Sequence, residues 1–321
     1  MKNILKRTIT AGTAALLSLM GLTGCMGNAP SHADDDTVRI IASNFALYDF
    51  ARLYESDGIV AEMLIAPGSE SHDLEATLAD ISTISSADIF IYAGGESDLW
   101  VDAAFESLKN AGEGIIRINA LSLITGEVYE SHEHHDHEDE NHAHESHAEA
   151  DEHVWTSIPN AITLIEEIGK AIEQADETKT IPDKAADYIQ KLSDLDTEYR
   201  QTVSDAARTK IAVADRFPFT HMAREYNISY SAAFEGCSSN VEVPLSVIND
   251  MIGEVKAEAL PAVFYIEFSD RTAVDTVCGE TGAIPLLLHS CHNVTKAELE
   301  SGVTYLDLMT QNLAHLKQAL N

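Results

Sequence analysis

The sequence predicts an α/β fold of two similar (βα) lobes, each built on a central, mainly parallel sheet. Short apolar runs of strand length alternate with segments whose apolar residues recur at helical spacing. This alternation is typical of a sheet wound with helices on both faces. It occurs twice, before and after one long helical segment. A chain of 321 residues with 45% hydrophobic residues allows two domains of ordinary size.

In the first half, apolar runs predict the strands and the amphipathic segments between them predict the helices. The run 87–93 is continuously apolar and ends at two glycines, as expected of a parallel strand that is covered on both faces. The strands are expected at 38–42, 59–65, 87–93 and 114–119, and the helices at 45–54, 77–86 and 100–110.

Two helical segments follow, at 160–174 and 183–208. The second contains no internal Gly or Pro, so we expect one helix of ~35–40 Å, long enough to span both halves. The second half then repeats the pattern of the first. Strands are expected at 210–214, 229–233, 262–267 and 284–289, and helices at 220–226, 245–257, 271–278 and 305–320.

The N-terminus has the pattern of a secretory signal. Basic residues precede an apolar run at 14–22, which is too short to cross a bilayer as a helix. The ending Leu22-Thr23-Gly24-Cys25 resembles the bacterial lipobox, which implies that Cys25 becomes the lipid-modified first residue of the mature protein. We therefore expect a signal peptide at 1–24 and a tether at 25–36; the alternative is a soluble secreted protein that is cleaved nearby.

Charge and histidine content indicate a cation as the partner. The formal net charge of −33 argues against nucleic-acid binding, which needs a basic face. Seven of the 14 histidines lie between His132 and His147, in an acidic loop at 130–150. Such a segment is expected to be solvated and disordered, and imidazole with carboxylate also makes it a metal-collecting loop.

The cysteines do not define a site. Besides Cys25 the chain has Cys237, Cys278 and Cys291, an odd number, and no CxxC motif. They are either a pair with a free thiol or three buried small residues.

Three histidines lie where a predicted strand or loop ends. In open α/β sheets, ligands bind beyond the carboxyl ends of the strands. His72 comes after the turn-rich stretch that follows strand 59–65, His153 ends the acidic loop, and His289 is the last residue of strand 284–289. Each alone could be an incidental or buried core histidine. Together they fit a zinc site with an open position.

The order of these motifs resembles the zinc and manganese ABC-transporter substrate-binding lipoproteins, in particular the zinc branch with a His-rich loop. The resemblance rests on Ala66 to Thr77, the strand Ala87 to Gly94 with Leu99-Trp100 after it, the His-rich loop, Asp151 to Trp155, and the long helix. It implies two α/β lobes joined by one rigid helix, with a single divalent metal in the cleft between them. It also implies that the metal is then delivered to a membrane ABC permease.

The resemblance also implies the domain limits and ligands. The first lobe would cover 37–182, the linking helix 183–208 and the second lobe 209–321. The family's metal ligands correspond to His72 and His153. His289 stands where the family has an aspartate, so it is the third expected ligand.

The chain departs from the family at the remaining ligand. The family's histidine in the second lobe aligns with Arg216, which cannot bind a metal because it stays protonated. Asp215 could supply an oxygen instead; His221 and Cys237 are weaker candidates, and water could complete the shell. A nitrogen-rich site favours Zn2+ over Mn2+, although copper and nickel also bind imidazole.

We therefore expect a monomeric, lipid-anchored, extracytoplasmic protein that captures zinc and delivers it to an ABC permease. An enzyme is not expected, because neither an HExxH helix nor a GxSxG elbow occurs. The alternative is a surface zinc buffer or metal-dependent adhesin without a transport role.

Overall fold

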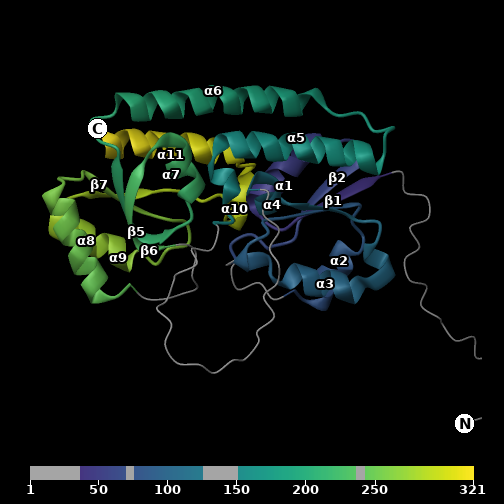
Figure 1. Ribbon diagram of the computed structural model, residues 1–321, viewed down its shortest axis with the longest axis horizontal. Coiled ribbons are helices and arrows are strands. Elements are labelled where there is room, and N and C mark those ends of the chain that lie inside the picture. The colour runs from purple at the N-terminus through teal and green to yellow at the C-terminus, as the bar shows by residue number, and fades with distance from the viewer. Residues whose placement is uncertain (1–36, 70–75, 126–150, 236–242) are drawn as a thin grey trace, which may run out of the picture. The chain divides into compact units, whose positions relative to one another are not determined.

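The computed structural model describes residues 37–69, 76–125, 151–235 and 243–321 (Figure 1). Cys25, His72, Cys237 and the His-rich loop lie outside these ranges. Among the described residues, no helix combines the length and apolar character that crossing a membrane requires.

Two four-stranded parallel sheets form the centre of the described chain. The first contains β1 (Val38–Ala42), β2 (Ile59–Met63), β3 (Ile89–Tyr92) and β4 (Ile116–Asn119), in the order β2-β1-β3-β4. The second contains β5 (Lys210–Phe217), β6 (Ser229–Glu235), β7 (Ala262–Tyr265) and β8 (Ile284–Leu287), in the order β6-β5-β7-β8. The expected fold class is confirmed, and both sheets have the same strand order. In such sheets the crevice lies at the carboxyl ends of the strands, beside the first strand.

Helices cover both faces of each sheet. Two short helices, α4 and α10, were not predicted, since six residues are too few to show a helical period. In the first half the helices are α1 (Phe45–Ala51), α2 (Leu78–Ile84), α3 (Trp100–Leu108), α4 (Ala120–Thr125) and α5 (Ile158–Ala175). In the second half they are α7 (Thr220–Tyr226), α8 (Leu245–Ala257), α9 (Thr272–Thr281), α10 (Lys296–Ser301) and α11 (Tyr305–Leu320).

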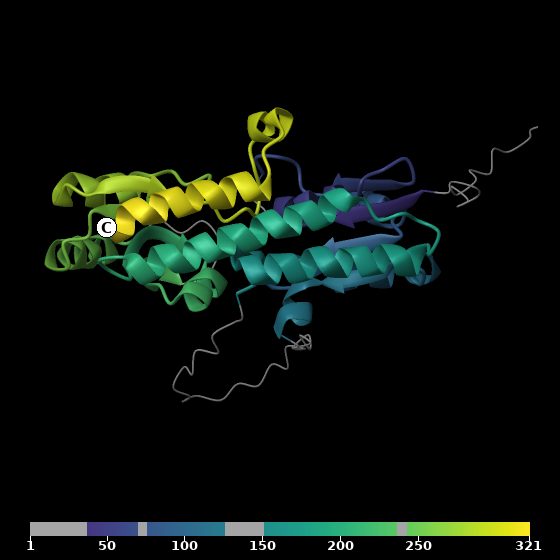
Figure 2. The same cartoon turned by 90° about the horizontal axis from the view of Figure 1, so that it is seen from above.

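The long helix α6 (Asp183–Asp205) lies against α5 of the first lobe and α11 of the second (Figure 2). It ends at Asp205, before the predicted end at residue 208, because Ala206 adopts an extended conformation. Its buried face includes Leu192 and Tyr199, and the Tyr199 hydroxyl donates to the carbonyl of Met309 at 2.7 Å. The helix is therefore packed along its length rather than exposed as a linker.

One hydrophobic cluster runs through both lobes. It contains residues of β1, β3 and α5 from the first lobe, the inner face of α6, and residues of β5, β7 and α11 from the second. Smaller clusters fill the outer faces, beneath α2 and α3 in one lobe and beneath α8 and α9 in the other. The lobes thus share their main core, which makes their separation costly.

A buried carboxylate joins α1, α6 and α11. Asp49 accepts hydrogen bonds from the Tyr188 hydroxyl at 2.9 Å and the Tyr305 backbone N–H at 2.7 Å, and it forms an ion pair with Arg52. Burial raises the pKa of Asp49, and the nearby charge of Arg52 lowers it by less. The cluster fixes the start of α11 on the first lobe.

After β8 the chain crosses back to the first lobe before it enters α11. We call residues 291–304 the return segment. The backbone N–H groups of Ala46 and Phe45 donate to the carbonyls of Cys291 and His292 at 3.1 and 2.9 Å. Further along, Arg52 donates to the carbonyl of Val303 at 2.6 Å. The return segment, which continues from the second lobe, is therefore hydrogen-bonded to the first lobe.

Candidate metal centre

His153 lies between the two lobes, directly before a short 3-10 helix at Val154–Thr156. Its side chain is buried, and its Nδ1 lies 2.8 Å from Oδ1 of Asp151. Because a carboxylate can only accept, Nδ1 carries the proton. The lone pair of the neutral ring is then on Nε2, which is the arrangement of a histidine ready to bind a metal.

The partner of that nitrogen is His292 of the return segment. Nδ1 of His292 lies 3.0 Å from Nε2 of His153, and both rings are buried. The backbone of His292 is held on both sides, since its carbonyl accepts from Phe45 and its N–H donates to the Ser290 hydroxyl at 3.2 Å. The pairing brings together residues that are 139 positions apart in the sequence.

A carboxylate completes the cluster. Glu152, His153 and His292 offer ligand atoms that all lie within 4.8 Å of one another, and all three side chains are buried. Zinc–nitrogen bonds of ~2.0–2.1 Å at tetrahedral angles put two ligand nitrogens roughly 3.3 Å apart. The histidine pair is therefore close to the spacing that a zinc ion needs.

Glu152 is positioned by the end of β3. Its Oε2 accepts from the backbone N–H of Ser97 at 3.0 Å, and its Oε1 accepts from the Ser97 hydroxyl. The side chain lies so close to Gly95 that a Cβ there would be 2.2 Å from Oε2. The absence of a side chain at Gly95 thus makes room for the carboxylate of Glu152.

A second acid beside Glu152 influences the charge of the site. Burial and the negative charge of Glu152 raise the pKa of Asp98 to about 7. Asp98 still accepts a hydrogen bond from the backbone N–H of Gly94 at 3.1 Å. At neutral pH a substantial fraction of Asp98 is consequently protonated, which relieves repulsion between the two buried carboxyls.

Asp151 connects His153 to the second lobe. Its Oδ2 accepts from the backbone N–H of Thr220 at 3.0 Å, and its carbonyl lies 2.7 Å from Nε2 of His221. Burial alone would raise the pKa of Asp151, but the hydrogen bonds and charge of His153 lower it to about 2. The orienting carboxylate is therefore ionised at neutral pH and anchored to both lobes.

Trp155 packs against both rings of the histidine pair. Its ring centroid lies 5.3 Å from that of His153 and 5.5 Å from that of His292. Its indole N–H donates to the carbonyl of Ser290 at 2.8 Å, and its own carbonyl accepts from the Tyr305 hydroxyl at 2.6 Å. The indole restricts water access on one side of the pair and provides a fluorophore in contact with the site.

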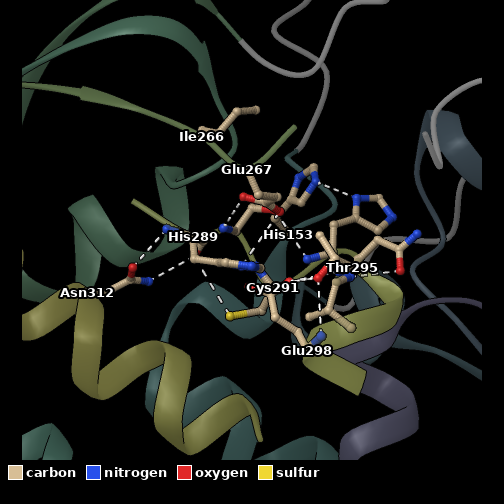
Figure 3. Close-up of polar contacts among 12 residues, drawn as sticks. His153, Ile266, Glu267, His289, Cys291, Thr295, Glu298 and Asn312 are labelled. Atoms are coloured by element: carbon tan, nitrogen blue, oxygen red, sulfur yellow. Dashed lines mark hydrogen bonds and ion pairs between the residues drawn. The ribbon is translucent and has the colours of Figure 1, made fainter. Parts of the chain in front are cut away.

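His289 is buried close by, but it is not in this cluster. Its Nδ1 accepts the backbone N–H of Cys291 at 2.9 Å, so the proton of the neutral ring is on Nε2. Figure 3 shows the residue held between Cys291 and Asn312, whose amide exchanges two backbone hydrogen bonds with it. In this arrangement neither ring nitrogen of His289 offers a lone pair to a metal.

The weaker candidates are engaged elsewhere. Asp215 accepts from the backbone N–H groups of Arg216 and Ile266, at 2.9 and 3.4 Å. His221 contacts Asp151, as described above. Neither belongs to the cluster of potential ligands found among the described residues. His72 lies outside the described residues, so its place remains a prediction.

Sequence reasoning missed His292 because it assigned the strand-end residue to the site. β8 ends at Leu287, and the chain then turns through Cys291, which has a φ of 62°. This left-handed residue redirects the backbone, and the following side chain enters the site. The signal in the sequence was a second histidine three residues after the first.

Two parallel α/β lobes that share a buried cluster of two histidines and a carboxylate define a two-lobed binding protein with a candidate metal site. The chain belongs to the family described as zinc-uptake complex component A, periplasmic, whose model matches residues 40–319.

Individual relatives agree with this assignment. The high-affinity zinc uptake system protein ZnuA of Bacillus subtilis is 29% identical over 315 residues, covering 97% of this chain and 96% of the relative. The zinc-binding lipoprotein AdcA of Streptococcus pneumoniae is 27% identical over 88% of this chain. The chain spans only 56% of AdcA. Among solved structures, the metal-dependent lipoprotein YcdH of Bacillus subtilis matches with a TM-score of 0.72 at 25% identity, over 89% of this chain and 100% of that one.

Proposed function

We propose that this protein captures zinc outside the cytoplasm and delivers it to an ABC permease for uptake. The observation that carries the proposal is the buried pair of His153 and His292, with Nε2 and Nδ1 3.0 Å apart. Membership in the zinc-uptake family, and the zinc-binding names of its relatives, support the choice of cargo.

The proposed ligands are His153, His292 and Glu152. His292 takes the role that the sequence suggested for His289, because only His292 faces a second imidazole. His72 remains the fourth candidate, as the family resemblance implies. Two or three imidazoles with one carboxylate suit Zn2+ better than Mn2+.

Metal capture requires a proton to move. Since Nδ1 of His153 is bound to Asp151, the hydrogen bond between the two rings must use a proton on Nδ1 of His292. Zinc can replace that proton if His292 shifts to the other tautomer or releases it. Affinity should therefore fall as the pH drops and the imidazoles become charged.

The N-terminal segment supports an extracytoplasmic location. We propose that Cys25 carries the lipid anchor and that residues 25–36 connect it to the binding lobes. Mass spectrometry of the membrane-associated protein would test this, and a mature N-terminus other than lipid-modified Cys25 would contradict it.

The main experiment separates a cleft binder from the alternative surface buffer or adhesin. Zinc is titrated by calorimetry into the mature chain and into a variant that lacks residues 131–148. One tight site that survives the deletion supports capture in the cleft. Loss of all tight binding would favour a buffer in which the loop is the site.

The transport role needs a cellular measurement. Cells that carry the variant without residues 131–148 should need more zinc for growth, because we propose that the loop raises the local supply. Cells that lack the whole protein should need more still. Growth of the null strain at wild-type zinc levels would overturn the transport proposal.

A further inference from the structure

The residue after His292 forms a bridge between the lobes that the metal site alone does not explain. The side-chain amide of Asn293 is buried and donates to the carbonyls of Ala66 and Ser69, at 3.0 and 2.8 Å. These carbonyls belong to the first lobe, 224 and 227 residues away in the sequence. Its Oδ1 accepts the backbone N–H of Val294 at 2.8 Å.

The partner of this amide is a tight turn. The backbone N–H of Ser69 donates to the carbonyl of Ala66 at 3.2 Å, and Gly68 has a φ of 83°. Proline at the second position and glycine with positive φ at the third are the pattern of a type II turn. The turn at Pro67 and Gly68 therefore presents the carbonyls of Ala66 and Ser69 as a rigid acceptor pair, shortly after the end of β2.

Only a primary amide satisfies all three contacts. The two hydrogens of Nδ2 reach two carbonyls, while Oδ1 remains free to accept. An ionised aspartate of the same shape can accept but cannot donate, and serine has one donor. Asparagine is thus matched to this position rather than merely tolerated.

We propose that Asn293 is a positioning residue for metal retention: it clamps the His292 backbone to the Ala66–Ser69 turn and so slows the release of zinc. Because consecutive Cα atoms are ~3.8 Å apart, movement of Asn293 displaces His292 with it. The inference rests on the proposed function, since it assumes that His292 binds zinc. It adds a residue that touches no metal.

The test compares Asn293→Leu with Asn312→Leu. Both asparagines are buried, and each makes two side-chain hydrogen bonds to backbone groups across the chain. Asn312 holds His289 within the second lobe, whereas Asn293 reaches the first. The two variants therefore lose similar hydrogen bonds. They differ in that only Asn293→Leu removes hydrogen bonds between the lobes.

Zinc release is measured by stopped flow with an excess of chelator, with Trp155 fluorescence as the signal. Asn293→Leu should speed release about tenfold, the factor expected from one or two lost hydrogen bonds, with the association rate within about twofold of wild type. Asn312→Leu should lower the thermal midpoint of the metal-free protein similarly and leave release within about twofold. A merely structural role for Asn293 would affect stability and not the release rate.

Two further variants keep the result decisive. If Asn293→Leu does not fold, Asn293→Ser, which retains one donor, should show an intermediate release rate. Asn110→Asp, at an exposed position, controls for handling and should match wild type. Equal release from the wild type and both Asn293 variants, or equal acceleration by Asn312→Leu, would overturn the inference alone. A wild-type chain that binds no zinc would overturn the proposed function and this inference with it.

Discussion

In each lobe a glutamate is bound by the backbone N–H and the hydroxyl of one serine; Glu152 is buried and Glu267 is partly buried. Ser97 binds Glu152 in this way, and Ser290 binds Glu267. Each glutamate also lies near a buried histidine: Glu152 precedes His153, and Glu267 lies 3.8 Å from Nδ1 of His289. The two lobes thus contain similar groups at corresponding ends of their sheets.

The difference lies in what the histidine ring contacts. In the first lobe Asp151 takes the proton of Nδ1, so the remaining nitrogen faces His292. In the second lobe a backbone N–H occupies Nδ1 of His289. Burial and a nearby carboxylate are therefore not enough to make a ligand. The hydrogen bond at the other ring nitrogen decides which histidine can bind metal.

The largest expected effect comes from replacing the histidines themselves. His153→Ala and His292→Ala should each weaken zinc binding by at least about 100-fold, since loss of a ligand exceeds the roughly 10- to 100-fold typical of its hydrogen-bond partner. His289→Ala should stay within about fivefold of wild type. Competition with a chromophoric zinc chelator measures all three. Loss of zinc binding in His289→Ala, with binding retained in His292→Ala, would show that His289 and not His292 is the ligand.

Next in size is the carboxylate that orients His153. Asp151→Asn should reduce zinc affinity about tenfold, because a neutral amide holds the Nδ1 proton less firmly. The same chelator assay applies at pH 7.5. Unchanged affinity would show that the orientation of His153 does not depend on Asp151.

The two glutamates provide a matched pair. Glu152→Gln and Glu267→Gln should each lower the free energy of unfolding by about 1–3 kcal/mol, since an amide nitrogen would face a serine donor. Only Glu152→Gln should also weaken zinc binding, by several-fold. Urea unfolding of the metal-free proteins and zinc competition separate the two effects. Equal losses of zinc affinity in the two variants would mean that Glu152 and Glu267 contribute alike to zinc binding.

The smallest expected effect concerns Asp49, a buried carboxylate outside the candidate metal centre. Because burial raises the pKa of Asp49 above its ordinary value of 3.8, the folded protein holds this proton more tightly than the unfolded chain. The contribution of Asp49 to the free energy of unfolding should thus decline as the pH rises from about 4 to its folded pKa. The stability advantage of wild type over Asp49→Asn should shrink between pH 4.5 and pH 8, with zinc affinity unchanged. If the stability advantage of wild type instead grew with pH, folding would lower the pKa of Asp49 rather than raise it.

The fold could be predicted because its signals are local. Strands β1, β3 and β7 are short apolar runs, and α6 has a long unbroken helical period. Each of these elements can therefore be predicted from its own residues alone. The repeated alternation then indicates two similar sheets. Element ends were less accurate: β5 extends to Phe217 through a register shift between Val213 and Arg216, which no apolar pattern reveals.

The site could be predicted only in part. His153, which belongs to the candidate cluster, was singled out because it closes a distinctive loop and precedes an aromatic residue. His292 and the amide bridge of Asn293 depend on contacts between residues more than 130 positions apart, and on the positive φ of Cys291. Propensities do not encode such contacts, so the sequence pointed to the strand-end residue His289 and not to His292.

The return segment has a consequence for the order in which the site forms. Phe45 and His292 are joined by a backbone hydrogen bond although they are far apart in the sequence, and closure of so long a loop comes late in folding. Until that loop closes, the first lobe lacks His292, the proposed ligand that the last tenth of the protein supplies. We therefore expect the complete metal centre proposed above to form only after the return segment has reached the first lobe, so that the folded protein binds zinc and the growing chain does not.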